Sequence, residues 1–427
     1  MSRSRYVRRL GLVVLVSALG VLVFAAALVS RSANAQDHDE GFDPNPWFIK
    51  HVFVIALENH NWTQPAGPAG SIQQIYQNPN APFINSLVNG TGAMYINGHL
   101  MNVSAQVAYA TAYHNVLATE SGNNPSIHPS EPQYIWAEAG TNFGVLQDSD
   151  PYTDTTTPNV FNTQHLSGLL QRAGKSWKSY QEDIDPQTDA NGKFINLPMD
   201  DSQWTVPLKS LSGVLDPSNF LNAYNDTLQY NYAPKHNPMV FFTDTNGNGD
   251  STAANTERLH YAPLQQLTFD LTDNQVADYN WITPDQYNEQ HSELTGGFAG
   301  LSGDSAQIRA GDNTVSRLVP MIMASRAYRD GGAIILWWDE SESVAGENAN
   351  DFAHTLGEIV ISPLAHRNEN GLPYASPYNY SHSSDLRTMQ EIFHVRASGG
   401  SSPYLGDAAN ATDLSDLFQP GVIPSLP

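Results

Sequence analysis

The chain has 427 residues, no cysteine and a formal net charge of -23 at pH 7. This acidic balance opposes binding to the nucleic-acid backbone and to anionic lipid surfaces, because both of these partners are negatively charged. Without cysteine the fold can form no disulfide, so its stability must come from core burial and from any bound metal.

The first 35 residues predict an export signal. Four arginines within residues 3–9 precede an uncharged stretch, residues 10–30, and Ala33-Asn34-Ala35 has the small-x-small pattern of a signal-peptidase site. An uncleaved membrane anchor is the alternative, since the stretch has the roughly 20 residues that span a bilayer. Arg8-Arg9 also permits a twin-arginine route. Cleavage leaves 15 Lys and Arg against 43 Asp and Glu, a net charge of -28. We therefore expect a secreted or periplasmic protein without stable membrane association after cleavage.

We expect one large folded domain at residues 51–398. An acidic, proline-bearing leader at residues 36–50 precedes it, and a loose tail at residues 399–427 follows it. No linker divides the domain, and no internal repeat of roughly 20 to 50 residues is present, which excludes solenoids and propellers.

Strands and helices alternate along this domain. Short β-rich runs predict strands at residues 51–57, 239–243, 280–283, 333–338 and 358–362. Apolar residues at helical spacing predict helices at residues 81–88, 163–172 and 313–329, and a last helix capped by Ser383-Ser384. Such alternation predicts an α/β fold with a largely parallel central sheet and helices on both faces. Long loops at residues 135–160 and 185–235 are expected to form the rim of a site.

Two of the predicted strands end on pairs of polar residues, Glu58-Asn59 and Asp339-Glu340. In an open α/β sheet, ligands bind beyond the carboxyl ends of the strands, so these side chains can meet around one point. For either pair alone a strand-end turn with exposed side chains is the simpler interpretation. Both strands are unusually apolar, however, and charge buried there is costly unless a metal or a partner compensates it. Together the pairs predict a metal site.

Ser130 stands between Pro129 and Pro132, which fix the backbone around its hydroxyl. A serine hydroxyl is a poor nucleophile near neutral pH unless a base or a metal lowers its pKa. A metal held by Glu58 and Asp339 could do that directly, so we predict Ser130 as a nucleophile. His128 and Gln133 lie near it in the sequence and offer hydrogen-bond donors to an anionic group.

Four histidines stand at the ends of predicted elements. His291, His354 and His382 each follow a strand or precede a helix, and His236 precedes the run at residues 239–243. His236 could bind a phosphate oxygen or cap a turn. A single histidine is more often a surface residue than a ligand, so the prediction depends on these residues acting together.

The segment Asp244-Thr245-Asn246-Gly247-Asn248-Gly249-Asp250 begins like a calcium-binding loop. The twelfth position of an EF-hand loop needs a bidentate glutamate, and Asn255 occupies it here. We therefore predict a solvated turn at this place.

Together these motifs resemble the phosphoesterase family of secreted acid phosphatases and phosphatidylcholine-type phospholipases C, a branch of the alkaline-phosphatase superfamily. The resemblance runs from about His51 to about Val395. The motifs that carry it, in chain order, are Glu58-Asn59, His128-Pro129-Ser130, Trp177 with Tyr180, Lys235-His236-Asn237-Pro238, Asp339-Glu340, and Tyr380-Ser381-His382-Ser383. It implies an alkaline-phosphatase-like α/β/α sandwich in which Glu58 and Asn59 bind metal and Ser130 is the nucleophile.

The sequence departs from the family pattern at three places. Gln133 replaces the asparagine that follows Ser-x-Pro, and Glu289 replaces the aspartate of the Asn-Asp-x-His segment. The Asp339-Glu340 pair lacks the continuation typical of the phospholipases, which leaves Asp351 and His354 as loose counterparts. The third departure favours a phosphatase over a phospholipase.

We therefore predict an exported, metal-dependent phosphoric-ester hydrolase, an acid-phosphatase-like phosphomonoesterase that acts on small phosphate esters through a phosphoserine intermediate. The predicted site comprises Ser130 as nucleophile; Glu58, Asn59, Asp339, Glu340, His291, His354 and His382 around the metal; and His128, Gln133 and His236 around the substrate. The cofactor is a divalent ion, with Ca, Mg, Mn, Zn and Fe all left open by this mixture of oxygen and nitrogen ligands. Two alternatives stay open: a phospholipase C-type phosphodiesterase acting on a phospholipid head group, and a non-catalytic exported binding protein on the same scaffold.

Overall fold

The computed structural model describes residues 48–115, 128–154, 156–198, 200–216, 221–344, 353–368 and 370–426. The predicted signal segment and nearly all of the predicted leader lie outside the described residues, and so does Asp351. Within the described ranges, no helix combines the length and the apolar character that a membrane crossing requires.

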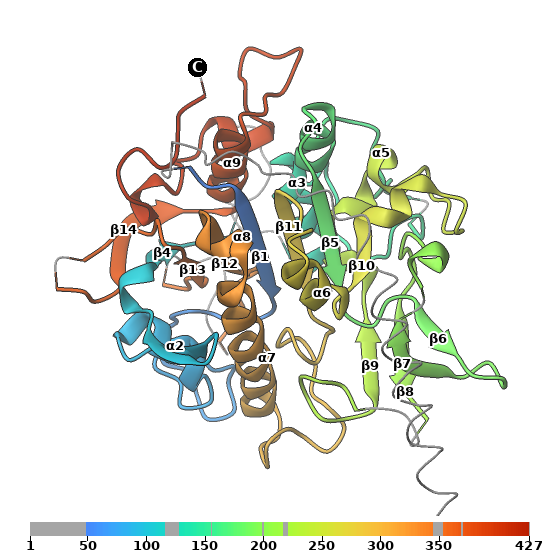
Figure 1. Cartoon of the computed structure of the whole chain (residues 1–427), viewed down its shortest axis with the longest axis horizontal. Helices are drawn as coiled ribbons and strands as arrows, with labels where there is room; N and C mark the ends of the chain where they lie inside the picture. The colour runs from blue at the N-terminus through green and yellow to red at the C-terminus, as the bar shows by residue number, and fades with distance from the viewer. Residues whose placement is uncertain are drawn as a thin grey trace, which may run out of the picture. The chain divides into compact units, whose positions relative to one another are not determined.

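An eight-stranded sheet forms the centre of the described part of the chain (Figure 1). From one edge to the other, its strands are β10 (Tyr261–Pro263), β5 (Trp177–Gln181), β11 (Tyr279–Thr283), β1 (His51–Leu57), β12 (Gly332–Trp338), β13 (Glu358–Ile361), β4 (Val107–Tyr113) and β14 (Tyr374–Tyr380). Among these strands only β13 runs antiparallel to its neighbours. The predicted largely parallel sheet is confirmed.

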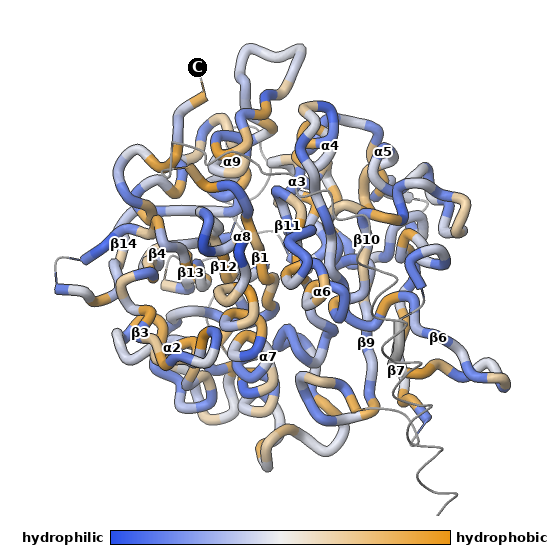
Figure 2. The backbone as a smooth tube through the Cα atoms, viewed as in Figure 1, coloured by the Kyte–Doolittle hydropathy of each residue, from blue (hydrophilic) through white to orange (hydrophobic). Residues whose placement is uncertain are grey.

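The two central strands are buried along nearly their whole length. In β1 only His51 is partly exposed, and every residue of β12 is buried. Continuous apolar runs of this kind, rather than alternating ones, are typical of strands that are covered on both faces. Figure 2 shows the same feature, because the tube of β1 is coloured as hydrophobic. Helices must therefore cover both faces of the sheet.

The α-helices of the described chain are α2 (Pro82–Asn89), α3 (Ser130–Ala139), α4 (Leu166–Arg172), α5 (Thr243–Asn246), α6 (Gln266–Thr272), α7 (Asp304–Ala324), α8 (Arg326–Arg329) and α9 (His382–Phe393). Helices α3 and α9 contact each other and line a small cavity together with Val54, Trp281 and Trp337 of the sheet. Helix α2 contacts α7, and Figure 1 shows α6, α7 and α8 in front of the strands.

Short elements complete the described chain. Three two-stranded antiparallel sheets consist of β2 (Ala93–Ile96) with β3 (His99–Asn102), β6 (Pro186–Thr188) with β7 (Phe194–Pro198), and β8 (Leu211–Val214) with β9 (Gln229–Tyr232). The 3₁₀ helices span Ser104–Gln106, Asp201–Gln203, Pro234–His236, Pro238–Phe241, Thr256–His260, Gly406–Ala409 and Ser415–Leu417. The predicted loop at residues 185–235 thus contains four strands, and the one at residues 135–160 begins inside α3.

Most of the predicted elements are confirmed, and one strand is wrong. The structure has the strands predicted at residues 51–57, 280–283, 333–338 and 358–362, and the helices predicted at residues 81–88 and 163–172, each shifted by at most a few residues. The helix predicted at residues 313–329 begins earlier, at Asp304, and ends at Ala324 because Ser325 caps α8. The run at residues 239–243 forms a 3₁₀ helix followed by α5. It is largely buried, and instead of a strand it makes an isolated β-bridge between Phe242 and Phe161. A short buried apolar run does not distinguish these two conformations by its periodicity.

The segment after Ser398 packs into the core, which corrects the expectation of a loose C-terminal tail. Leu414 and Phe418 are buried there, and the Asp407 amide donates a hydrogen bond of 2.8 Å to the carbonyl of Gly140. Gly140 ends α3 with a φ of 66°, and a Cβ at this position would lie 2.7 Å from the backbone of the tail. The absence of a side chain there permits this close approach.

A buried pair of carboxyl groups, Glu358 of β13 and Asp385 of α9, lies in the core. The Tyr113 hydroxyl donates a hydrogen bond to Asp385. Burial raises the pKa of both carboxyl groups, that of Asp385 to about 7, and the charge of Asp385 raises that of Glu358 further. The folded protein therefore binds protons that the unfolded chain releases, which makes its stability depend on pH.

We expect the Asp385→Asn variant to gain stability relative to the wild type as the pH rises. The pKa of Asp385 is raised in the folded state, so its stabilising contribution is complete below the ordinary value of 3.8 and is lost as the pH rises to about 7. The loss amounts to at most about 4 kcal/mol over this interval. Calorimetric Tm values of both proteins across the interval provide the measurement. Asp273→Asn, at an exposed aspartate, is the control, and parallel pH curves for Asp385→Asn and the wild type would contradict the assignment.

Candidate active site

Strands β1 and β12 are parallel neighbours in the middle of the sheet, so their carboxyl ends lie side by side. The parallel register pairs Leu57 with Trp338, so the residues that follow them, Glu58 and Asp339, are neighbours. The backbone amide of Asn59 donates a hydrogen bond of 3.1 Å to Oδ1 of Asp339. Both carboxyl groups are fully buried. The structure thus brings together the two polar pairs that end the apolar strands.

Ser130 is the first residue of α3 and lies against these carboxyl groups. Its Oγ is 3.0 Å from Oε2 of Glu58 and 3.1 Å from Oε1 of Glu340, and the Asp339 carboxyl contacts it as well. A serine hydroxyl has one proton and can donate it to only one carboxylate at a time. The amino-terminal end of α3 contributes the positive end of its helix dipole to this place. Distant segments therefore converge on one hydroxyl group.

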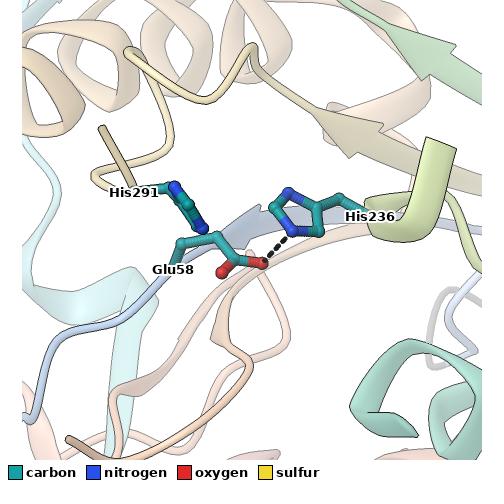
Figure 3. Close-up of side chains that lie close together, drawn as sticks. All are labelled: Glu58, His236 and His291. Carbon is teal, nitrogen blue, oxygen red and sulfur yellow. Dashed lines mark ion pairs between the residues drawn. The ribbon is translucent and has the colours of Figure 1, made fainter. Parts of the chain in front are cut away.

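Two histidines also lie beside Glu58, as Figure 3 shows. Glu58, His236 and His291 offer ligand atoms that all lie within 4.8 Å of one another. Nε2 of His236 is 3.5 Å from Oε1 of Glu58, and its Nδ1 is 2.7 Å from Oε1 of Glu289. Burial lowers the pKa of each imidazole to about 3, so both rings are neutral near pH 7. A neutral ring that donates from Nδ1 to a carboxylate presents a lone pair on Nε2, as metal-binding histidines do.

The residues of this cluster fit a divalent cation. Burial raises the pKa of Glu58, and Asp339 and Glu289 raise it further through their like charge. Among the polar atoms that are buried here without a hydrogen-bond partner are Oδ1 of Asn59, Oδ2 of Asp339, Oε2 of Glu289 and Nε2 of His236. Unpaired buried polar atoms and crowded carboxylates are costly, and a bound metal ion would satisfy both.

His128 also reaches the cluster, whereas Gln133 and His382 contact each other beside it. Nδ1 of His128 lies 2.6 Å from Oε2 of Glu340. Nδ1 of His382 is 3.0 Å from Oε1 of Gln133, and its Nε2 is 3.1 Å from the carbonyl of Trp338. Both ring nitrogens of His382 are therefore engaged by the protein. The structure does not support its predicted role as a metal ligand and instead makes it a link between α3, α9 and β12.

His354 does not join the cluster through any contact among the described residues. Its Nδ1 is 3.0 Å from the carbonyl of Glu342 and 3.4 Å from Nδ2 of Asn61. Its Nε2 is buried without a hydrogen-bond partner. The ligand role of His354 stays a prediction, because the contacts of its Nδ1 connect this histidine to the segment after the Asp339-Glu340 pair and its buried Nε2 is unpaired.

Tyr134 is a member of the site that the sequence analysis gave no role. Its hydroxyl donates a hydrogen bond of 2.5 Å to Oε1 of Glu58, and its ring stacks on His236 with centroids 5.1 Å apart. Tyr134 stands four residues after Ser130, and residues at this spacing share one face of a helix. Had a helix been predicted to begin at Ser130, the four-residue spacing would have indicated that Tyr134 belongs to the site.

The comparison with protein families decides the classification. Residues 105–396 match the sequence model of the Phosphoesterase family, which is well over half of the chain and includes Ser130, His236 and Asp339. The chain belongs to the phosphoesterase family. Glu58 and Asn59 precede the matched region but contact residues within it, as the distances above show.

Curated relatives of this phosphoesterase are named acid phosphatases. The chain is 23% identical over 293 residues to a probable acid phosphatase of Kluyveromyces lactis, covering 68% of this chain and 55% of that protein. It is 22% identical over 240 residues to a phosphate-repressible acid phosphatase of Penicillium chrysogenum, covering 56% of this chain and 44% of that protein. An acid phosphatase of Aspergillus fumigatus is 26% identical over 165 residues, covering 38% of this chain and 28% of that protein. The chain thus spans about half the length of the first two.

Solved structures give a weaker similarity. A protein in the alkaline phosphatase superfamily from Vibrio parahaemolyticus aligns with a TM-score of 0.42 and 11% sequence identity, covering 88% of this chain and 77% of that chain. The phosphonate monoester hydrolase of Agrobacterium radiobacter aligns with a TM-score of 0.39 and 11% identity, covering 87% and 78%. Because these TM-scores are low, we base the α/β classification on the sheet order and strand directions of the phosphoesterase itself.

Proposed function

We propose that this phosphoesterase is a metal-dependent phosphoric-ester hydrolase with Ser130 as its nucleophile. One observation carries the proposal: the buried hydroxyl of Ser130 lies 3.0 Å from Glu58 and 3.1 Å from Glu340, in a cluster that also contains Asp339. The family and the acid-phosphatase names of its relatives support the substrate class, a small phosphate ester.

In the first half of the reaction, Oγ of Ser130 attacks phosphorus in line with the leaving oxygen. The bond between Oγ and phosphorus forms while the ester bond breaks, and the hydroxyl proton passes to the Glu340 carboxylate. The leaving oxygen takes up a proton from solvent water and departs as an alcohol. Phosphoryl transfer of this kind depends mainly on positioning and on charge stabilisation.

In the second half, water attacks the phosphoserine from the side that the alcohol has left. The bond between phosphorus and Oγ breaks, Ser130 regains from Glu340 the proton it gave up, the attacking water releases one proton to solvent, and inorganic phosphate is released. His128 contacts Glu340 through Nδ1 and is partly exposed, so it can exchange protons between that carboxylate and solvent. The chain thereby returns to its starting protonation state.

We assign the metal to the oxygen atoms of Glu58, Asn59 and Asp339, with His236 and His291 beside Glu58. Glu340, predicted as a further oxygen ligand, is assigned instead to accept the proton of Ser130. A divalent cation there would lower the pKa of the Ser130 hydroxyl and neutralise charge on the phosphoryl oxygens. The oxygen atoms suit Ca, Mg or Mn, and the imidazoles suit Zn or Fe. His236 thus moves from its predicted substrate role to a ligand role, because its Nδ1 faces Glu289 and its Nε2 faces Glu58.

The substrate assignment predicts faster turnover of a chromogenic phosphomonoester than of lecithin. Initial rates of the purified protein on both substrates, at equal enzyme concentration, provide the measurement. A large preference for lecithin would replace the monoesterase with a phospholipase C-type phosphodiesterase. Absence of turnover on either substrate, together with no metal in elemental analysis after mild purification, would indicate the non-catalytic binding protein.

We further propose that the protein is exported by means of residues 1–35. The support is the arginine-rich start, the uncharged apolar stretch and Ala33-Asn34-Ala35. The intact mass of the protein from the medium or periplasm of an expressing bacterium should correspond to a chain that begins at Gln36. Recovery of the uncleaved chain in the membrane fraction would establish an anchor instead.

A further inference from the structure

A second group of acidic residues also lies beyond the carboxyl ends of the parallel strands, apart from the active-site cluster. Glu182 and Asp183 follow β5, and Asp285 follows β11, whose last residue Thr283 pairs with Gln181. Ligand atoms of the three acids lie within 4.8 Å of one another. The group shares no residue with the set formed by the active-site carboxylates and histidines, so it is a separate site.

Asp285 has one carboxylate oxygen without a hydrogen-bond partner. The amides of Tyr287 and Asn288 donate hydrogen bonds of 3.1 Å and 2.9 Å to Oδ1. The whole residue is only 1% exposed, and its Oδ2 is buried and accepts no hydrogen bond. The Asp285 carboxyl also contacts that of Asp183. Because the two amides occupy Oδ1, Oδ2 is the oxygen of Asp285 that remains available to a ligand shared with Glu182 and Asp183.

Glu182 is held in place by neutral donors. Nδ2 of Asn222 donates to Oε1 at 2.6 Å, Nδ2 of Asn288 lies 3.0 Å from both oxygens, and the amide of Asp285 donates to Oε2 at 2.9 Å. These donors orient the carboxylate without neutralising it. Among the ion pairs between described residues, none joins a lysine or arginine to any of the three acids.

The geometry points to a calcium site formed by Glu182, Asp183 and Asp285. All three candidate ligands are oxygen atoms, and no histidine belongs to the group, which disfavours zinc. Calcium accepts roughly six to eight oxygen atoms at flexible angles, whereas magnesium demands octahedral geometry and gives up its water reluctantly. A largely buried group of carboxylates therefore suits calcium better than magnesium.

Protons are the competing occupants of this group. In the protein without a cation, burial and then the charge of Asp183 raise the pKa of Glu182 to about 8. Burial raises the pKa of Asp183 to about 6. The three acids would then share protons near neutral pH, and calcium would have no effect on the fold. Direct measurement of calcium binding separates the two occupants.

Calcium at this position would stabilise the turn that carries part of the active site. The Glu289 amide donates a hydrogen bond of 2.9 Å to the carbonyl of Asp285, and the Glu289 carboxylate contacts His236 at 2.7 Å. The second site is thus a positioning element, since Asp285 and its neighbours touch no reacting atom. Its existence is independent of the reaction proposed above.

The test uses the full-length Glu58→Gln variant, because its active-site cluster lacks one ligand and calcium binding then reports on the second group. After metal removal with a chelator, calorimetric titration should show a single equivalent of bound calcium, and calcium should raise Tm by several degrees. Adding Asp183→Asn should weaken calcium binding by at least about 10-fold, because it removes a charged ligand. Asn can still accept the hydrogen bond that the Asn231 amide donates to Asp183.

Asp226→Asn in the same background is the matched control, because Asp226 is an exposed acid in the adjacent turn, and it should leave calcium binding unchanged. The proposal is overturned by no calcium binding in Glu58→Gln, by undiminished binding after Asp183→Asn, or by an equal Tm shift with magnesium. Should Asp183→Asn fail to fold, a wild-type crystal soaked in calcium gives the same decision. An anomalous peak among the three acids supports the site, and its absence overturns it.

Discussion

The Ser130→Ala variant should lose phosphatase activity by roughly 10³-fold or more while it keeps its fold. The variant removes the hydroxyl that we propose forms the covalent bond to phosphorus. The helix should tolerate the change, because alanine favours helices and Ser130 is not the N-cap of α3, a position that Pro129 occupies. The rate constant kcat on a chromogenic phosphomonoester is the measurement, and near-UV circular dichroism checks the fold.

Two further measurements make this result specific. Acid quenching during turnover of a ³²P-labelled substrate should trap labelled phosphoserine in the wild type and none in Ser130→Ala. Ser316→Ala is the matched control, since the Ser316 hydroxyl of α7 only bonds to the backbone of its own helix, and it should keep full activity. Wild-type turnover by Ser130→Ala would remove the phosphoserine mechanism altogether.

The sequence predicted the centre of the sheet because its pattern is strong there. The runs that became β1 and β12 are apolar at nearly every position and end abruptly on Glu58-Asn59 and Asp339-Glu340. Burial on both faces requires such runs, and the rule that ligands lie beyond strand ends then places the acids together. Strand β4, with exposed Thr111 inside it, carries no such pattern and was not predicted.

Helix α3 escaped prediction because its prolines indicated a rigid turn. Pro129 is the N-cap, and Pro132 stands in the first turn, where a missing amide hydrogen breaks no helical bond. Proline is therefore compatible with a helix that starts at Ser130. This error concealed Tyr134, whose contact with Glu58 depends on the helical spacing from Ser130.

The histidines show what a sequence without coordinates does not resolve. His236, His291, His354 and His382 all stand at the ends of elements, so their positions in the chain give them equal claims. Only tertiary contacts separate them: His236 and His291 face Glu58, whereas both nitrogens of His382 are engaged elsewhere. A ligand role depends on where the second ring nitrogen goes, and this information is absent from a linear pattern.

The Glu58→Gln variant should lose bound metal and, with it, nearly all activity, while its metal-free form should gain stability. Glu58 is in contact with Ser130, Tyr134 and His236, so it belongs to both halves of the proposed ligand set. Glutamine has the same shape without the charge, and we expect metal affinity to fall by about 100-fold or more. Removal of one of several crowded buried carboxylates should at the same time raise Tm in chelator, because the like charges no longer repel one another.

These two opposite changes distinguish a metal ligand from a structural glutamate. Elemental analysis gives the metal content, calorimetry in chelator gives Tm, and re-addition of divalent ions should restore activity to the chelated wild type but not to Glu58→Gln. Glu131→Gln is the matched control. Glu131, in α3, is buried as Glu58 is, but it accepts hydrogen bonds from Ser149 and Asn159 outside the cluster. Metal should therefore stay bound in this variant. A Glu58→Gln protein that keeps the active-site metal, counted apart from any calcium at Glu182, Asp183 and Asp285, would contradict the ligand role. A Glu58→Gln variant that loses stability in chelator would show that Glu58 supports the fold through its hydrogen bonds with Ser130 and Tyr134. Repulsion between the carboxylates would then not destabilise the metal-free wild type.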